Sequence, residues 1–166
     1  MSEATVRDAT VEDATAIARV QLTVWRTVFA DFLPTAVVDG LDDDAVAGSW
    51  AQAVGTPGDA HVLVALEGGE VTGFAAGSGA EVATLLVDPR WGRRGHGGRL
   101  LGTLAARLHA GGAQRAQVWV AENDEASRRF FTRHGWDADA TVRTSHHGAQ
   151  LLRERRHTGS LPMRWE

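Results

Sequence analysis

The order of hydrophobic patterns along the chain predicts a single domain of the mixed α/β (α+β) class. With 166 residues, the chain has the length of one ordinary domain, which is enough to bury a hydrophobic core. Helix-like and strand-like segments follow one another in the order β-α-α-β-β-β-α-β-α-β-β. The polar stretches at 55–59 and 111–112 are short loops and not linkers between domains. We expect the domain to span residues 1–156, with a C-terminal tail at 157–166.

The first third of the chain predicts one short strand and two helical regions. Residues 6–7 lie in the strand. Thr10 is a typical helix cap, and apolar residues then recur on one helical face, which predicts an amphipathic helix over about 11–29. A looser helical region follows at about 34–50.

Three strands are expected in the middle of the chain. A turn at 67–70 joins the strands at 61–66 and 71–77 into a hairpin. The run at 81–87 is almost entirely apolar, which is typical of a strand buried on both faces, and Pro89 ends it. The remaining elements are a helix, a strand, a short helix and a final hairpin, at 100–110, 117–121, 124–134, 136–143 and 149–155.

The composition excludes several classes of protein. The formal net charge is -4 at pH 7, whereas nucleic-acid-binding domains usually carry a strong basic excess. No run of about 18 apolar residues occurs, so a membrane span is not expected. The first residues lack a basic and then apolar secretion signal, which makes the cytoplasm the expected location. The chain has no Cys, no Lys and no Tyr, which excludes thiolate metal sites, lysine Schiff bases and a phenolic proton donor.

The glycine- and arginine-rich segment at 92–98 is the clearest chemical signal. Glycines let backbone N–H groups converge on one point, and the positive end of the following helix dipole points there too. Arg93 and Arg94 add full positive charges. These features favour a phosphorylated ligand, and the alternative is a tight loop with solvated arginines. A P-loop is excluded by the absence of Lys, and a dinucleotide fingerprint fits poorly because Leu100 stands at its third glycine position.

Residues 87–101 resemble the acyl-CoA motif of the GNAT superfamily of N-acyltransferases. The family pattern is Gln/Arg-x-x-Gly-x-Gly/Ala; Gly95 and Gly97 match its two small positions, while Gly92 stands where Gln or Arg is usual. Further segments are similar to family motifs in the same order, at 7–13, 70–74 and 127–136. The resemblance therefore covers nearly the whole chain.

The resemblance implies a central, mostly antiparallel sheet of six to seven strands, with splayed fourth and fifth strands and about four flanking helices. It also implies acetyl-CoA as cosubstrate, with its pantetheine arm on the fourth strand and its pyrophosphate on the loop amides. The residues expected to contact it are Leu85, Leu86, Val87, Arg93, Arg94, Gly95, His96, Gly97, Gly98, Asn123, Ser127 and Phe130. Asn123 is preferred as the only Asn in the chain; counting back from Phe131 gives Asp124 instead, and helix capping is the alternative role for Asn123.

The implied activity is the transfer of an acetyl group to a primary amine, most simply of a small molecule, by direct attack in a ternary complex. Glu81 is the expected general base and Glu122 the second candidate. The alternative for both is an ordinary charged residue, either paired with an arginine or solvated. Phe131 stands where the family often has a tyrosine acid, and it cannot donate a proton. Two other functions therefore stay open: a non-catalytic acyl-CoA-binding module, and acetylation of protein N-termini or lysines.

Aromatic residues of the early helical regions are expected to form the acceptor pocket. Phe29, Phe32 and Trp50 are the candidates, whereas core packing explains Trp25 better. His146 and His147 have no third ligand at usable spacing, so no metal site is expected. A small-molecule amine is the expected partner, without nucleic acid or membrane, and the apolar residues of the tail leave a homodimer open.

Overall fold

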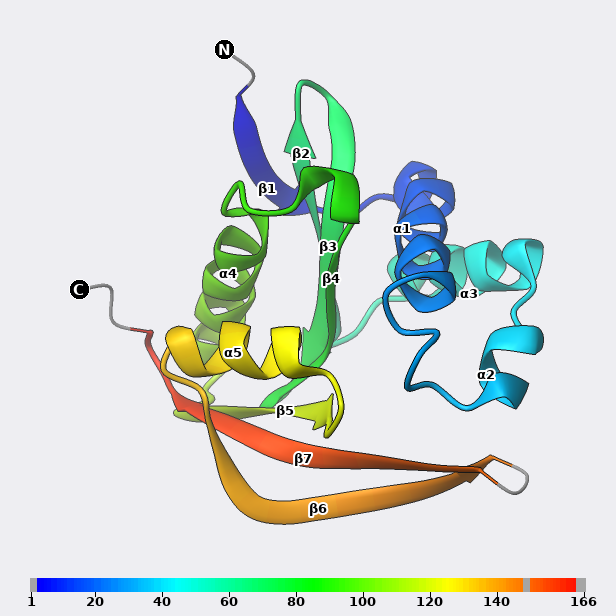
Figure 1. Cartoon of the computed structure of the whole chain (residues 1–166). Helices are drawn as coiled ribbons and strands as arrows, with labels where there is room; N and C mark the ends of the chain where they lie inside the picture. The colour runs from blue at the N-terminus through cyan, green and yellow to red at the C-terminus, as the bar shows by residue number, and fades with distance from the viewer. Residues whose placement is uncertain (1–2, 148–149, 164–166) are drawn as a thin grey trace.

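The computed structural model describes residues 3–147 and 150–163, and its described part contains one seven-stranded sheet (Figure 1). The strand order is β1-β2-β3-β4-β5-β7-β6, and every neighbouring pair except β4–β5 is antiparallel. The strands are β1 (Ala4–Asp8), β2 (His61–Glu67), β3 (Glu70–Ser78), β4 (Glu81–Val87), β5 (Arg115–Ala121), β6 (Asp137–His147) and β7 (Gln150–Ser160).

Five α-helices accompany the sheet in the described ranges. They are α1 (Ala14–Arg26), α2 (Thr35–Asp39), α3 (Asp43–Gly55), α4 (His96–Ala110) and α5 (Glu125–Arg133), with short 3-10 turns η1 (Val11–Asp13) and η2 (Pro89–Trp91). Over the residues that can be described, no helix is long and apolar enough to cross a membrane.

The helices form two layers, with α1 and α3 on one side of the sheet and α4 and α5 on the other (Figure 1). Each layer buries one apolar helical stripe against the strands. The stripe of α4 consists of Leu100, Leu104 and Leu108, and the stripe of α1 consists of Ile17, Val20 and Val24. Burying a side chain of this size stabilises the fold by roughly 1.5–3 kcal/mol. The two clusters hold the central strands between them, so the sheet is a rigid base for a site.

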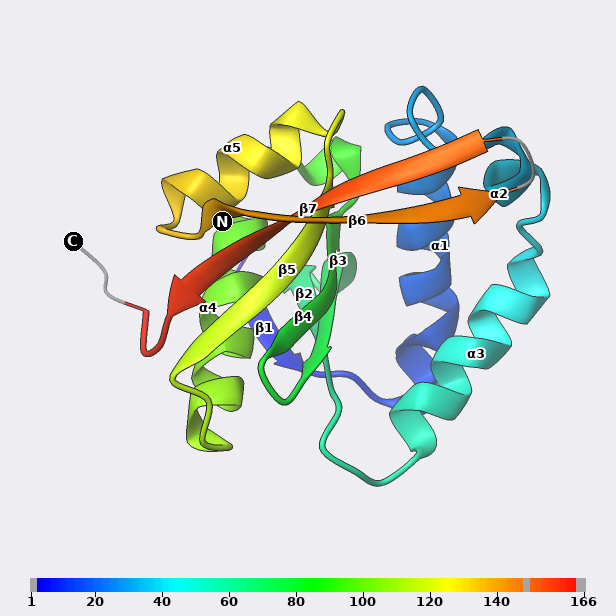
Figure 2. The same ribbon diagram turned by 90° about the horizontal axis from the view of Figure 1, so that it is seen from below.

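The β6–β7 hairpin extends from the sheet toward α2 (Figure 2). β7 pairs with β5 along one edge and with β6 along the other. Near its tip, the amide of Thr35 at the start of α2 donates a hydrogen bond of 2.6 Å to the side-chain oxygen of Gln150. The hairpin therefore connects the sheet to the helical layer on the α1 side.

β7 continues to Ser160, past the domain boundary expected at residue 156. His157 and Leu161 are buried, and Gly159 packs directly under the ring of Trp136. A Cβ atom on Gly159 would lie 2.7 Å from three atoms of that ring. The first residues of the expected tail at 157–166 are therefore part of the sheet, because β5 supplies them with backbone partners.

The predicted fold class and the order of elements are confirmed, and the differences lie at element ends. The first helix ends at Arg26, before the expected position 29, because the amide of Phe29 bonds to the carbonyl of Val24 at 2.9 Å and turns the chain. The looser helical region consists of two helices, α2 and α3, with Gly40 capping the first. The final two strands are longer than expected.

Candidate functional site

β4 and β5 are parallel neighbours that separate after two residue pairs. Glu81 lies opposite Gln117 and Val82 opposite Val118, and no further pair joins these strands in the part of the chain described. Beyond that point, one edge of β4 pairs with β3 while the edge facing β5 has no strand partner. An extended chain with amide groups can bind such an edge as an added strand.

A bulge in β4 marks the place where the gap begins. Val82 and Thr84 pair with adjacent residues of β3, Gly77 and Ala76, so Ala83 is an extra residue without its own partner. A bulge bends its strand and changes the direction of the backbone groups. The bend therefore occurs where β4 separates from β5.

A cavity of about 270 Å³ lies in this gap. Its walls come from α1 and the segment leading to α2, from β4 and β5, from α5 and from the β6–β7 hairpin. Leu85 and Leu86 line it from β4, and Phe131 lines it from α5. Most of the lining is apolar, so the cavity suits the apolar part of a ligand.

The loop between η2 and α4 presents backbone amides without protein acceptors. Among the described residues, the amides of 93–98 donate no hydrogen bond to the protein. Gly95 has a φ of 81° and Arg93 a φ of 62°, both in the left-handed region. That conformation costs an arginine on the order of 1–2 kcal/mol, but it brings successive N–H groups to one side. With the N-terminus of the 15-residue helix α4 behind them, these amides form an anion site.

Four side chains hold this loop in a closed ring of hydrogen bonds. Glu67, at the end of β2, accepts from Arg94 Nη1 at 2.8 Å with one oxygen and lies 3.1 Å from His96 Nε2 with the other. Arg99 Nη2 donates to the carbonyl of Arg94 at 3.1 Å and lies 3.0 Å from His96 Nδ1. Through this ring, Arg94, His96 and Arg99 are tied to Glu67 at the end of β2. The ring therefore fixes the backbone amides that lie between residues 94 and 99.

The ring sets the protonation of His96. An arginine donates to Nδ1 and a carboxylate faces Nε2, so the neutral tautomer with the proton on Nε2 satisfies both contacts. Burial and then the charge of Arg99 lower the pKa of His96, against the opposing effect of Glu67. The His96 side chain is completely buried, so its backbone amide, and not its ring, belongs to the candidate anion site.

The arginines of the loop differ in role. Arg94 forms an ion pair with Glu67 and stacks over the ring of Trp91 at 5.1 Å, so its charge is largely neutralised within the protein. Arg93 has no such partner among the described residues, and its side chain is exposed. Of the two arginines expected at the phosphates, Arg93 is therefore the one whose full charge remains available.

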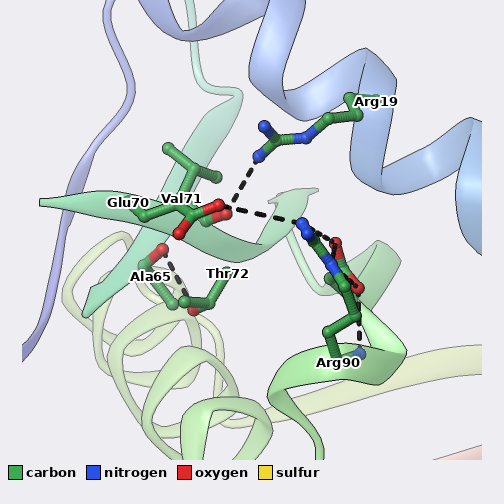
Figure 3. Close-up of polar contacts among 7 residues, drawn as sticks. Arg19, Ala65, Glu70, Val71, Thr72 and Arg90 are labelled. Carbon is green, nitrogen blue, oxygen red and sulfur yellow. Dashed lines mark hydrogen bonds and ion pairs between the residues drawn. The ribbon is translucent and has the colours of Figure 1, made fainter. Parts of the chain in front are cut away.

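A second set of contacts fixes the end of β4 (Figure 3). The buried carboxylate of Asp88 accepts from the amide of Arg90 at 3.0 Å and from its guanidinium at 3.1 Å. Burial alone would raise the pKa of Asp88, but these bonds outweigh it and hold the pKa below the usual range. Arg90 also lies 3.7 Å from Glu70, and Arg19 of α1 donates to the carbonyl of Val71 at 3.2 Å. β4 therefore ends at a fixed position relative to β3 and α1.

Two glycines in the first turn of α4 allow α5 to pack against α4. A Cβ on Gly97 would lie 3.1 Å from the ring of Phe130, and one on Gly98 would lie 3.1 Å from the ring of His134. His134 is held by a 2.8 Å hydrogen bond between its Nδ1 and the carbonyl of Phe130. Phe130, an expected cosubstrate contact, thus packs against the first turn of α4.

At the start of α5, Asp124 rather than Asn123 lies in the cavity. Asp124 is 7% exposed and caps the helix by accepting from the amide of Ser127 at 3.1 Å. Ser127 lines the cavity as well. Asn123 is exposed and lines a neighbouring cavity of about 140 Å³. The geometry therefore favours Asp124, the residue reached by counting back from Phe131, over Asn123 as the expected cosubstrate contact.

The two expected bases lie beside the main cavity and not within its lining. Glu81 lies at the closed end of the gap, in a shallow depression that shares Ala83 with the cavity. Glu122 lines the smaller cavity, between Arg153 at 3.6 Å and Arg155 at 3.4 Å. The catalytic role of each remains a prediction.

Of the four aromatic residues considered in the early helical regions, three line the cavity and one does not. Phe29 and Phe32 line the cavity, with ring centroids 4.9 Å apart. Trp50 instead packs edge-on against Phe74 and donates a 2.7 Å hydrogen bond to Gln21, so it belongs to the packing between helices and sheet. Trp25, expected in the core, lines the cavity while its remaining surface packs on the α1 cluster.

Two further titratable residues line the cavity, Glu154 and His147, and neither was predicted from the sequence. Glu154 stands out in the sequence as the one acid among arginines 153, 155 and 156. Its position at the cavity depends on which strand lies beside β5, and spacing alone does not reveal that. In the residues that the structure describes, no group of three His, Cys, Asp or Glu could hold a metal ion.

The fold combines an open strand edge on β4 with backbone amides at the N-terminus of α4 that have no acceptor among the described residues, which is a geometry suited to an extended ligand that carries an anionic group. Residues 25–136 match the model of a family described as acetyltransferase (GNAT) family. The chain therefore belongs to the GNAT family of acetyltransferases. No protein among the curated sequences matches it.

Several solved structures share this fold. A GCN5-related N-acetyltransferase from Rhodopseudomonas palustris is 25% identical with a TM-score of 0.78, and 97% of this chain and 98% of that one are covered. The PaiA N-acetyltransferase from Thermoplasma acidophilum, in complex with coenzyme A, is 14% identical with a TM-score of 0.76, covering 95% and 99%. YncA, a putative acetyltransferase from Salmonella typhimurium with its cofactor acetyl-CoA, is 20% identical with a TM-score of 0.71, covering 98% and 96%.

Proposed function

We propose that the protein is an acetyl-CoA-dependent N-acetyltransferase that acetylates a primary amine of a small molecule. The observation that carries this proposal is the run of amides at 93–98 without protein acceptors, at the N-terminus of α4 and beside the open edge of β4. A diphosphate fits the amides, and the amide-bearing arm of coenzyme A fits the strand edge. Family membership and the ligands of the two structural neighbours support the same cosubstrate.

The chain's own residues would divide the work along this path. The amides of 93–98 and the charge of Arg93 bind the diphosphate. The backbone of Leu85, Leu86 and Val87 pairs with the pantetheine arm. Phe131 and the cavity walls exclude water from the thioester, which strengthens electrostatic interactions there.

The bound ammonium group must first lose one proton to free the nitrogen lone pair. The lone pair then attacks the thioester carbonyl carbon, the N–C bond forms, and the C–S bond breaks with its electron pair leaving on sulfur. The second proton leaves the nitrogen as the amide forms and balances the charge of the coenzyme A thiolate. Glu81 and Glu122 are the proposed acceptors of the first proton. Ala83 lies between the depression of Glu81 and the cavity, so proton transfer from the amine to Glu81 would require a bridging water. Phe131 offers no acid, but the thiolate of coenzyme A is a fair leaving group.

Calorimetric titration with acetyl-CoA, coenzyme A and ATP tests the cosubstrate. We expect micromolar binding of the first two and none of ATP. Gly95→Ala should weaken binding, because φ is 81° there and the new Cβ would lie 3.0 Å from Arg99 Nη1. Gly69→Ala is the matched control, with the same φ of 81° but no atom within 4 Å. Absent acetyl-CoA binding, or equal effects of the two variants, would overturn the assignment.

Release of free thiol with a panel of amines tests the reaction. Glu81→Gln and Glu122→Gln should lower kcat selectively if either carboxylate accepts the proton. A second candidate function is an acyl-CoA-binding module without turnover, which Phe131 favours because it lines the cavity where a phenol is usual and the chain has no Tyr. Tight acetyl-CoA binding without thiol release for any amine would establish that alternative and exclude the transferase.

A further inference from the structure

The cavity has a part that the path of the cosubstrate does not use. Its wall is formed by apolar residues of α1, the segment to α2, α2 itself and β7, and we call this set the acceptor wall. The acceptor wall consists of Trp25, Phe29, Phe32, Leu33, Val37 and Leu152. Figure 2 shows the β6–β7 hairpin extending from the sheet toward α2, and Leu152 of β7 lines the cavity. A molecule bound here therefore meets aromatic and branched aliphatic groups over most of its surface.

One carboxylate faces this otherwise apolar space. Glu154 lines the cavity, and its side chain is 18% exposed. Its Oε1 accepts from Arg143 Nε at 2.8 Å, while Oε2 has no partner among the described residues. Arg143 itself stacks over the ring of Trp119 at 4.6 Å and is half exposed. Glu154 therefore keeps one oxygen for a cation inside the cavity.

The other acids near the cavity have different partners. Asp124 also lines the cavity, and its Oδ1 caps α5, while Glu122 lies between Arg153 and Arg155. Near the acceptor wall lies the polar ring of His147, whose Nε2 is 3.1 Å from Ser145 Oγ. Of the two carboxylates that line the cavity, Glu154 is the one on the same strand as Leu152 of the acceptor wall.

We propose that the acceptor is a primary amine with a single positive charge and a flat or branched apolar body, whose ammonium group binds Glu154 and whose body packs on the acceptor wall. This inference rests on the proposed function and names its substrate class. Arylalkylamines such as 2-phenylethylamine and tryptamine represent the class. Glu154 is then a specificity-determining residue, and Phe32 and Trp25 select the body of the amine.

The size of the cavity limits the acceptor. Its volume of about 270 Å³ must also hold the end of the acetyl-pantetheine arm. Pockets for drug-sized ligands span roughly 300–1,000 Å³, so only a small acceptor fits beside the thioester. A folded peptide segment or an amino sugar of several rings is too large.

The chemistry of the walls separates the remaining amines. A polyamine carries several positive charges, whereas the two carboxylates of the described lining each have one oxygen engaged, Glu154 with Arg143 and Asp124 with the cap of α5. A single-ring amino sugar would bury hydroxyl groups against aromatic rings without hydrogen-bond partners, which is unfavourable. An apolar amine has a single charged group to desolvate, which Glu154 can offset, and its body gains contact with Phe29 and Phe32.

An amine panel tests the substrate class. Thiol release is followed with 2-phenylethylamine, tryptamine, ethylamine, spermidine, glucosamine and a lysine peptide at saturating acetyl-CoA. We expect kcat/KM for the arylalkylamines to exceed that for spermidine, glucosamine and the peptide by at least tenfold. Higher kcat/KM for spermidine or glucosamine overturns the inference but leaves the proposed function standing. Higher kcat/KM for the lysine peptide, or thiol release with none of the panel, argues against both.

Two variants test the assigned contacts. Glu154→Gln should raise KM for 2-phenylethylamine by ten- to a hundredfold and leave the Kd of acetyl-CoA unchanged. Glu125→Gln is the control, because Glu125 lies exposed on α5 and pairs only with Arg129 in the described contacts. Equal KM values for both variants would overturn the role of Glu154.

Phe32→Ala separates packing from charge. It should lower kcat/KM for 2-phenylethylamine at least tenfold and change that for ethylamine less than threefold, because ethylamine has no ring to pack. An equal loss for both amines would mean that Phe32 does not select the apolar body. Acetyl-CoA titration of this variant verifies that the site is still folded.

Discussion

The ring of hydrogen bonds under the anion site gives a sharp prediction for Glu67→Gln. Both oxygens of Glu67 face donors, Arg94 Nη1 at 2.8 Å and His96 Nε2 at 3.1 Å. Glutamine keeps one acceptor but places an NH₂ group against the second donor. In the variant, the loop should therefore no longer be held in one position, while the domain stays folded.

The size of the effect follows from the exposure of the two contacts. A hydrogen bond to a charged group contributes about 1.5–3 kcal/mol when buried. The Arg94 side chain is 53% exposed, so its pair with Glu67 contributes nearer to 1 kcal/mol. The contact with the buried His96 contributes most of the rest. Together, the two contacts of Glu67 contribute about 2 kcal/mol to holding the loop in place. In the variant, acetyl-CoA binding must supply this free energy to order the loop, which corresponds to a Kd roughly 30-fold higher.

Calorimetric titration with acetyl-CoA at pH 7.5 measures this change. Glu70→Gln is the matched control, since Glu70 lies on the same hairpin, is 46% exposed and approaches Arg90 only at 3.7 Å. Its Kd should stay within twofold of the wild type. Positioning by Glu67 predicts a higher KM for acetyl-CoA at unchanged kcat. A Kd for Glu67→Gln equal to that of the control would refute the reasoning.

Three further outcomes are expected. Burial and the charge of Arg99 keep the pKa of His96 below its usual value of 6.5, so the unfolded chain binds this proton more readily than the folded one. The free energy of unfolding, measured with urea, should fall as the pH drops from 7.5 through 6.5 to 5.5. The fall should be smaller in His96→Gln. Urea midpoints that rise on acidification would contradict this prediction. Gly97→Ala should weaken acetyl-CoA binding only slightly, because the ring of Phe130 needs to move by a few tenths of an ångström, whereas Gly97→Leu should weaken it at least tenfold by calorimetry. Gly159→Ala should destabilise the fold by about 1–3 kcal/mol in urea unfolding, since its methyl group would meet a buried indole ring at 2.7 Å, while Gly48→Ala, with no atom within 4 Å, should not.

The elements that carry the cosubstrate path could be predicted because local pattern determines them. The apolar run of β4 and the leucine stripe of α4 each identify an element with little dependence on its neighbours. The loop between them is marked by glycines that its backbone requires, above all Gly95 in the left-handed region. This part of the fold was therefore predicted with nearly correct boundaries.

The contacts of side chains could not be predicted where they depend on how distant elements meet. His96 and Glu67 are 29 residues apart, and their contact requires that β2 ends beneath the loop. Trp50 and Trp25 are both aromatic residues of early helices, and only the rotation of each helix on the sheet decides which one faces the cavity. Glu154 belongs to a strand whose existence was predicted but whose place in the sheet was not.

The position of β7 has a consequence during protein synthesis. β7 follows β6 in the chain but lies between β5 and β6 in the sheet. While a ribosome has released the chain only through β6, the outer edge of β5 has no partner, and an uncovered strand edge is a template for association with other chains. The carboxylate of Glu154 and the closing side of the cavity also arrive only with β7. The site of a nascent chain is therefore incomplete until β7 has emerged. The interval before β7 emerges is also the period in which the chain most needs protection from aggregation.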